Sequence, residues 1–341
     1  MTRLERLRNR RIDPLILTAP LLNEVYDRIE DDEVIRYAIG AMQPLEPEYQ
    51  AGYLSESRLI QNHLRPKAAR AGIPVDFLWQ GSLTNDTHIS FSSDLEILVI
   101  DGNFTTLEPP QKAIIPYTEN PVEELRSLRN LALESVKAAW PEAEMDTSDP
   151  FRILCAGGGL KREIRLYFAN WYHSNVYITH REEKFRGLNI LDNHKDRRVC
   201  RFPFLHNALI EEKDALSKGS LKKMVRLLKS LLDDGEERYG LPGYHLSSLI
   251  WNMPERNLAY GRGQELQLIQ SAYDYLIYVL TNERYRNNLK VPDGTANIFD
   301  PEGATKNQLQ ITSKLLGGLA KDILQVLQRS SRTLAQVHID Y

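Results

Sequence analysis

The sequence predicts an α+β fold, with a mixed sheet and flanking helices in its N-terminal half and an all-helical lobe in its C-terminal half. Apolar residues recur at helical spacing, give way to short strand-like stretches, and return to helical spacing. The strand-like stretches end near residue 205, and 341 residues are enough for two lobes. We therefore expect a core lobe over 1–204 and a helical lobe over 205–341, with a ligand cleft between them.

Two amphipathic helices are predicted at the start of the core lobe, over Pro20–Met42 and Leu54–Ala71, with Pro66 kinking or ending the second. The period then changes, and the stretches VDFLWQGS and DLEILVI read as strands flanking a polar turn. Helical spacing returns over Pro121–Ala139, where proline stands at the first position of the helix.

A second pair of strands is predicted in FRILCAGGGLKREIRLYFANWY, joined by a glycine-rich hairpin at 157–159. These glycines lack the spacing of a phosphate loop and do not open a helix. Helices are then expected over Leu221–Leu232, Gln264–Thr281 and Asn307–Leu327. Ser220 is the predicted N-cap of the first. Gly317 and Gly318 indicate a close crossing or a break in the last.

The composition excludes several function classes. Lys and Arg number 43 against 46 Asp and Glu, so the net charge of −3 argues against strong binding to nucleic acid. Two distant cysteines, Cys155 and Cys200, argue against a zinc module and for a reducing compartment. No apolar stretch has the length of a membrane span, so we expect a cytoplasmic protein with no membrane partner.

The chemistry is concentrated between the first two predicted strands. Gly81 and Ser82 form a small turn, and after eleven further residues Asp94 and Glu96 enter an apolar strand. Alternate residues of a strand share a face, so the two carboxylates stand side by side and need a neutralising cation such as Mg²⁺ or Mn²⁺. The turn offers amides and a hydroxyl to a phosphate, and Thr87 extends this polar cradle. The alternative is a hairpin whose strand is held by ion pairs.

The pattern of Gly-Ser, eleven residues, Asp, one residue, and Glu resembles the signature of the polymerase-β-like nucleotidyltransferase superfamily. Further stretches resemble the bacterial cGAS/DncV-like nucleotidyltransferases (CD-NTases): YFANWY, LKKMVRLLKSLL, LKVPDGTANIF and the terminal amphipathic helix. The resemblance covers about residues 50 to 330, and its specific part is the Gly-Ser and acid-pair block. It implies a polymerase-β-like lobe followed by a helical lobe.

The resemblance also implies a third metal-binding carboxylate on a later strand. The matching stretch, EIRLYFANW, has Arg165 at the corresponding position. Glu163 is the nearest acid on the same face of this predicted strand, so it is the candidate third ligand. Arg165 is then a candidate for binding phosphate.

Cations on the helix that follows residue 220 are candidates for the triphosphate. Lys222, Arg226 and Lys229 share one face, which is commonly just a solvated basic face. In the family that the chain resembles, the equivalent helix contacts the triphosphate, so the resemblance assigns this role to Arg226 and Lys229.

The function that the resemblance implies is metal-dependent nucleotidyl transfer. Asp94 and Glu96 would hold Mg²⁺ or Mn²⁺, and ATP, GTP, UTP or CTP would be joined into a cyclic di- or trinucleotide. Such a second messenger would reach a separate effector protein in defence against phage. Two alternatives stay open: a catalytically silent nucleotide-binding or sensing protein, and a nucleotidyltransferase that modifies RNA ends or a protein hydroxyl.

Overall fold

The computed structural model describes residues 1–12, 25–45, 47–90, 93–235, 239–301, 303–334 and 339, with the backbone alone over 47–53. The chain forms two compact units. The sheet unit comprises Glu46–Thr84 and Ser92–Ala208, and the helical unit comprises Met1–Leu45, Asn85–Phe91 and Leu209–Tyr341. The predicted division into a core lobe over 1–204 and a helical lobe over 205–341 stays a prediction. In the structure, residues 1–45 belong to the same compact unit as the helices that follow residue 208.

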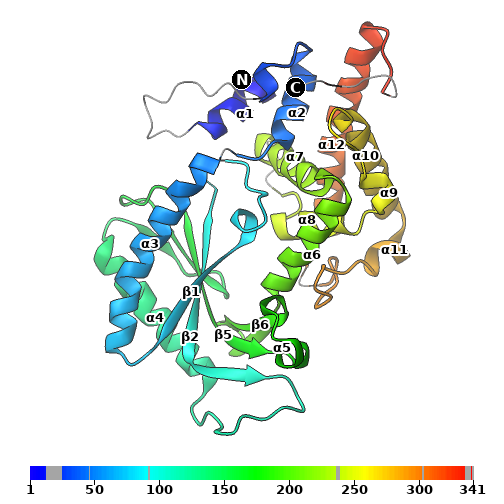
Figure 1. Cartoon of the computed structure of the whole chain (residues 1–341). Coiled ribbons are helices and arrows are strands. Elements are labelled where there is room, and N and C mark those ends of the chain that lie inside the picture. Colours follow the sequence, from blue (N-terminus) through cyan, green and yellow to red (C-terminus); the bar gives the residue numbers. More distant parts are fainter. Residues whose placement is uncertain are drawn as a thin grey trace. The chain divides into compact units, whose positions relative to one another are not determined.

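The sheet unit is built on a mixed sheet of seven strands (Figure 1). The strands are β1 (Val75–Gln80), β2 (Leu95–Leu107), β3 (Glu144–Asp146), β4 (Arg152–Ala156), β5 (Ile164–His173), β6 (Arg186–Asp192) and β7 (Arg197–Arg201). Their order is β1-β2-β5-β4-β3, with β6 also paired to β5 and β7 paired to β6. β2 and β5 are parallel and the other pairs are antiparallel. The strand order places β2 between β1 and β5, and β5 pairs with β2, β4 and β6.

The helices of this unit are α3 (Pro47–Arg70), α4 (Pro121–Ala139), α5 (Asn175–His180) and the start of α6 (Pro203–Leu216), with 3₁₀ turns at Gly81–Leu83 and Glu183–Phe185. α3 and α4 pack on one face of the sheet, against Leu95, Ile97 and Val99 of β2. The opposite face carries a smaller apolar cluster that includes Leu98 and Ile100. Alternation along β2 therefore directs the side chain of Glu96 to the face away from α3 and α4.

The predicted elements of this unit are largely confirmed. α4 begins at Pro121, as predicted, because Asn120 caps it by accepting a hydrogen bond from the amide of Val122. α3 covers the second predicted helix and passes through Pro66 to Arg70. The β6–β7 hairpin was not predicted, because charged residues interrupt its apolar alternation.

The helical unit contains a large apolar core. Its helices are α1 (Arg3–Arg11), α2 (Glu33–Met42), the remainder of α6, α7 (Ser220–Asp234), α8 (Gly243–Trp251), α9 (Glu255–Leu258), α10 (Glu265–Thr281), α11 (Glu283–Asn287) and α12 (Lys306–Arg329), with a 3₁₀ turn at Val25–Asp27. α7, α10 and α12 match the three predicted helices of this half to within a few residues.

Three predictions in this unit need correction or qualification. Within residues 25–42, the helix predicted over Pro20–Met42 begins only at Glu33, because Asp32 caps it by accepting a hydrogen bond from the amide of Val34; residues 20–24 lie outside the described residues. The N-cap of α7 is Gly219, with φ of 81°, because the hydroxyl of Ser220 donates to the carbonyl of Tyr260. α12 is unbroken at Gly317, which lies against the ring of Tyr273 where a Cβ would be 2.6 Å from Cε2.

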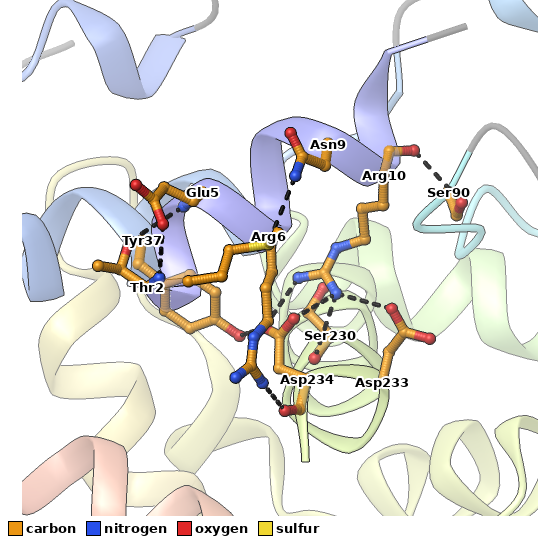
Figure 2. A network of polar contacts seen from close by, with 11 residues as sticks. Thr2, Glu5, Arg6, Asn9, Arg10, Tyr37, Ser90, Ser230, Asp233 and Asp234 are labelled. Carbon is orange, nitrogen blue, oxygen red and sulfur yellow. Dashed lines mark hydrogen bonds and ion pairs between the residues drawn. The ribbon is translucent and has the colours of Figure 1, made fainter. Parts of the chain in front are cut away.

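Buried ionic contacts fasten α1 to α7 (Figure 2). Both terminal nitrogens of Arg10 bind the carboxylate of Asp234, at 2.9 and 3.0 Å, and the side chains are 7% and 4% exposed. The hydroxyl of Tyr37 donates to the same carboxylate at 2.6 Å. Asp233 and the Ser230 carbonyl accept further bonds from Arg10. The N-terminal helix is thereby an integral part of the helical unit.

Membrane crossing finds no support in the described part of the chain, where none of the helices has both the length and the hydropathy that a bilayer span needs.

Candidate active site

The Gly81 turn follows the end of β1. The last residue of this strand, Gln80, is in register with Glu96 on β2. Gly81 has φ of +79°, a backbone conformation that favours glycine. A Cβ at this position would lie 2.8 Å from Cδ of Glu96 and 2.9 Å from Oε2. The absence of a side chain therefore lets the turn that carries Ser82 lie directly against a carboxylate.

The acid pair lies at the start of β2. Asp94 immediately precedes the strand, and Glu96 is its second residue. Their side chains are 31% and 23% exposed, so both are accessible to a small ligand. The amide of Leu95 donates to the carbonyl of Glu163 at 2.9 Å, which fixes the start of β2 against the start of β5. Gly81, Ser82, Asp94, Glu96, Glu163 and Arg165 all belong to the sheet unit.

Arg165 lies among three carboxylates. The parallel register aligns it with Glu96, and its guanidinium pairs closely with Asp94. The other two distances are 3.8 Å from Nη1 to Oε1 of Glu96 and 3.6 Å from Nη2 to Oε2 of Glu163. The expectation that Glu163 and Arg165 share the face of the acid pair is consistent with these contacts. Their roles as metal ligand and phosphate ligand stay predictions.

The electrostatics of the site reflect partial burial of like charges. Burial raises the pKa of Asp94 to about 6; Arg165 opposes this shift, and the carboxylates of Glu163 and Glu96 add to it. Tyr167 lies two residues after Arg165 on β5. Burial and the charge of Glu96 raise the pKa of its hydroxyl to about 12, so this hydroxyl is protonated at neutral pH. The site therefore has excess negative charge that a cation would stabilise.

The residues fit one divalent cation better than two. Within the described residues, no group of three or more His, Cys, Asp or Glu side chains is arranged to hold a metal ion. Mg²⁺ characteristically takes one or two protein carboxylates and completes its shell with water and substrate phosphates. Asp94 and Glu96 meet that requirement for one ion.

A second buried ion pair supports the site and was not predicted. Glu56 on α3 binds Nε of Arg162 at 2.7 Å and the amide of Lys161 at 2.6 Å, and the two charged side chains are 4% and 2% exposed. The neighbouring Ser57 accepts a hydrogen bond from the indole of Trp79 on β1. α3 thus holds both the segment before Glu163 and the strand before Gly81. No local pattern marked Glu56, because its partners are distant in sequence.

The remaining predicted residues, Thr87, Arg226 and Lys229, belong to the helical unit. There α7 binds the spacer, which is the part of the chain between Ser82 and Asp94, at residues 86 and 87. Arg226 donates from Nε to the carbonyl of Met42 at 2.7 Å and from Nη1 to the carbonyl of Asp86 at 2.6 Å. Lys229 donates to the carbonyl of Thr87 at 2.7 Å. The Thr87 hydroxyl is buried and bonds Oδ1 of Asn85.

These contacts bring Thr87, Arg226 and Lys229 together as a structural group. Arg226 is 5% exposed; it donates to two backbone oxygens, and Nη1 also lies 3.3 Å from the carboxylate of Asp86. The Ser90 hydroxyl donates to the carbonyl of Arg10 at 3.3 Å, which adds a contact between the spacer and α1 (Figure 2). Phosphate binding by Thr87, Arg226 and Lys229 stays a prediction.

Comparison with known proteins agrees with this architecture. The family model described as the cGAS/DncV-like nucleotidyltransferase C-terminal helical domain matches residues 208–319. A protein of Yersinia aleksiciae called cyclic dinucleotide synthase CdnE is 28% identical over 303 residues, which are 88% of this chain and 79% of the relative. These findings support a bacterial cGAS/DncV-like nucleotidyltransferase (CD-NTase), whose C-terminal helical domain is the part that the family model matches.

Solved structures agree on the fold of the chain. A STING-associated CdnE c-di-GMP synthase from Capnocytophaga granulosa superposes with a TM-score of 0.74 at 23% identity, covering 95% of this chain and 98% of that one. The Rhodothermus marinus CdnE c-UMP-AMP synthase with Apcpp and Upnpp gives a TM-score of 0.59 at 15% identity, covering 78% and 91%. The fold is that of a polymerase-β-like nucleotidyltransferase with a C-terminal helical lobe, as predicted.

Proposed function

We propose that this CD-NTase is a metal-dependent nucleotidyltransferase that makes a cyclic di- or trinucleotide second messenger from nucleoside triphosphates. The observation that supports this proposal most strongly is the pair of carboxylates, Asp94 and Glu96, at the start of β2, with the turn at Gly81 against Glu96. The name of the Yersinia relative supports a cyclic dinucleotide product, and the Rhodothermus structure contains nucleoside triphosphate analogues.

In the proposed reaction, a ribose hydroxyl of one nucleotide attacks the α-phosphorus of another. An O–P bond forms, the bond to pyrophosphate breaks, and the hydroxyl proton passes to solvent. For a cyclic dinucleotide, a second transfer within the linear intermediate closes the ring and releases a second pyrophosphate. For a cyclic trinucleotide, the linear intermediate first reacts with a third nucleoside triphosphate, and a third transfer then closes the ring, so that three pyrophosphates are released in all.

The residues of the sheet unit would bind and orient the triphosphate. Asp94 and Glu96 would hold Mg²⁺ or Mn²⁺, which supplies positive charge to the phosphates when bound. The missing side chain of Gly81 admits the backbone turn close to Glu96, and Ser82 offers a hydroxyl to a phosphate oxygen. The substrates would be ATP, GTP, UTP or CTP. By family analogy, the product would activate a separate effector protein in defence against phage.

One observation favours a second candidate function. The close pair of Arg165 with Asp94 gives that carboxylate a cationic partner without any metal. A protein that binds nucleotide without joining it would need no more than this arrangement. The second candidate is therefore a nucleotide-binding or sensing protein without transferase activity.

A product assay separates these functions. The purified protein is incubated with each α-³²P-labelled nucleoside triphosphate, alone and in mixtures, with Mg²⁺ or Mn²⁺, and the products are treated with phosphatase and resolved by chromatography. The proposal predicts a labelled compound that resists phosphatase and lacks free ends. Label in added RNA or in protein would indicate the other transferase reactions. Nucleotide binding without any product would support the silent protein.

A further inference from the structure

The acid cluster consists of Asp94, Glu96 and Glu163. The position of Arg165 determines how much further positive charge this cluster can bind. Its place is set by the backbone, because β5 runs parallel to β2 with Arg165 in register with Glu96. The guanidinium contacts Asp94 and lies within 4 Å of oxygens of Glu96 and Glu163. The side chain is 24% exposed, so it is held inside the cluster rather than extended into solvent.

The charge of the cluster follows from these contacts. Asp94, Glu96 and Glu163 contribute three negative charges when ionised, and the guanidinium of Arg165 returns one positive charge. The remainder, −3 + 1 = −2, balances one divalent cation. A guanidinium also uses carboxylate oxygens that a metal would need as ligands, so it competes with the ion for Asp94.

We infer that Arg165 is a built-in cation that restricts this site to a single divalent ion and weakens the binding of that ion. The inference rests on the proposed function for the metal site itself. It assigns Arg165 a role in setting cation number and affinity, in addition to any contact with phosphate. A chain with a carboxylate in this position would have the charge and the ligands for a second ion.

The test measures metal binding rather than catalysis. Mn²⁺ is titrated into the full chain with and without the non-hydrolysable analogue Apcpp. Free Mn²⁺ is followed by electron paramagnetic resonance, and binding to the nucleotide alone is subtracted. The wild-type chain should bind one Mn²⁺ with the analogue. Arg165→Met should bind Mn²⁺ at least about tenfold more tightly in its absence, because a competing charge is removed. Arg165→Asp should bind two ions with the analogue.

Two further variants serve as controls. Arg165→Lys keeps the charge and should keep the stoichiometry of one, while Arg165→Gln is a second uncharged variant in case Arg165→Met does not fold. Two ions in the wild-type chain, or unchanged affinity in both uncharged variants, would overturn the inference.

A separate variant distinguishes this failure from failure of the proposed function. Asp94→Asn combined with Glu96→Gln should abolish Mn²⁺ binding at the site. If the double variant binds Mn²⁺ as the wild-type chain does, the metal site and the inference fail together. If the double variant loses binding but the uncharged Arg165 variants bind Mn²⁺ as the wild-type chain does, the role of Arg165 alone is wrong.

Discussion

Gly81 and Glu96 are so close that position 81 has no room for a side chain, and the backbone there also has a conformation that favours glycine. A Cβ there would lie 2.8 Å from Cδ of Glu96, and φ is +79°. Gln80 is paired with Glu96 across β1 and β2, so the contact is a consequence of sheet register. The phosphate-binding turn and the metal-binding carboxylate of the proposed site are therefore mechanically coupled.

This contact predicts the effect of Gly81→Ala, for which Gly72→Ala is the matched control. Gly72 has φ of +74° with no neighbour within 4 Å of a Cβ, so its substitution adds only backbone strain, about 1 kcal/mol. Gly81→Ala should cost at least about 1 kcal/mol more and lower product formation more than tenfold, because Glu96 must move. Urea unfolding and the product assay measure the two effects. Equal behaviour of the two variants would contradict the contact.

The raised pKa of Asp94 predicts a pH-dependent gain in stability for Asp94→Asn. The pKa in the folded chain is about 6 against an ordinary 3.8, so the contribution of Asp94 to stability is complete below pH 3.8 and is lost as pH rises through 6. Asparagine does not titrate. Relative to pH 3.8, the variant should therefore gain about 2 kcal/mol over the wild-type chain by pH 7.5. Unfolding is measured in EDTA at both pH values, and a difference that is independent of pH would count against the shift.

Glu56 and Arg162 predict a large loss of stability from a single change. Glu56→Gln leaves the guanidinium of Arg162 buried beside a neutral group and should cost about 3–5 kcal/mol. The double variant Glu56→Gln with Arg162→Met removes the buried charge as well, so it should recover most of this loss. Denaturant unfolding of the three chains measures the coupling. A single variant within about 0.5 kcal/mol of the wild-type chain would show that the pair is not buried.

We expect the substitution Arg226→Met to destabilise the helical unit, and Lys222→Met on the same helix is the control. Arg226→Met removes the bonds to the carbonyls of Met42 and Asp86 and should cost about 2–4 kcal/mol. Lys222 pairs with Glu211, and the two side chains are 12% and 51% exposed, so Lys222→Met should cost about 1 kcal/mol or less, well below the cost of Arg226→Met. Thermal unfolding compares them. Equal melting temperatures would exclude the role of Arg226 in holding the spacer.

Much of the site could be predicted from sequence because its parts follow from strand periodicity. The alternation of β2 sets the shared face of Asp94 and Glu96, and the small residues at 81 and 82 mark the turn. The place of Arg165 among the carboxylates follows from the parallel register of β2 and β5. A local pattern can nominate the two strands but carries no information about their register.

Contacts between distant segments account for what the sequence left unpredicted. Arg226 and Lys229 lie on one helical face, as expected, but most of the oxygens that they bind are backbone carbonyls, of residues 42, 86 and 87, and no side-chain pattern predicts such partners. The assignment of residues 1–45 to the helical unit depends on buried pairs such as Arg10 with Asp234, separated by more than two hundred residues. Each half of such a pair looks like an ordinary surface charge in the sequence.

The most direct test of the central claim is the dependence of product formation on the acid pair. Asp94→Asn and Glu96→Gln are compared with Glu134→Gln, a substitution on an exposed position of α4, in the labelled-nucleotide assay with Mg²⁺ or Mn²⁺. Both site variants should lose at least about a hundredfold in rate while Glu134→Gln keeps the wild-type rate, because charge neutralisation at the phosphates is lost only in the first two. A cyclic product formed at the wild-type rate by Asp94→Asn or Glu96→Gln would contradict the account.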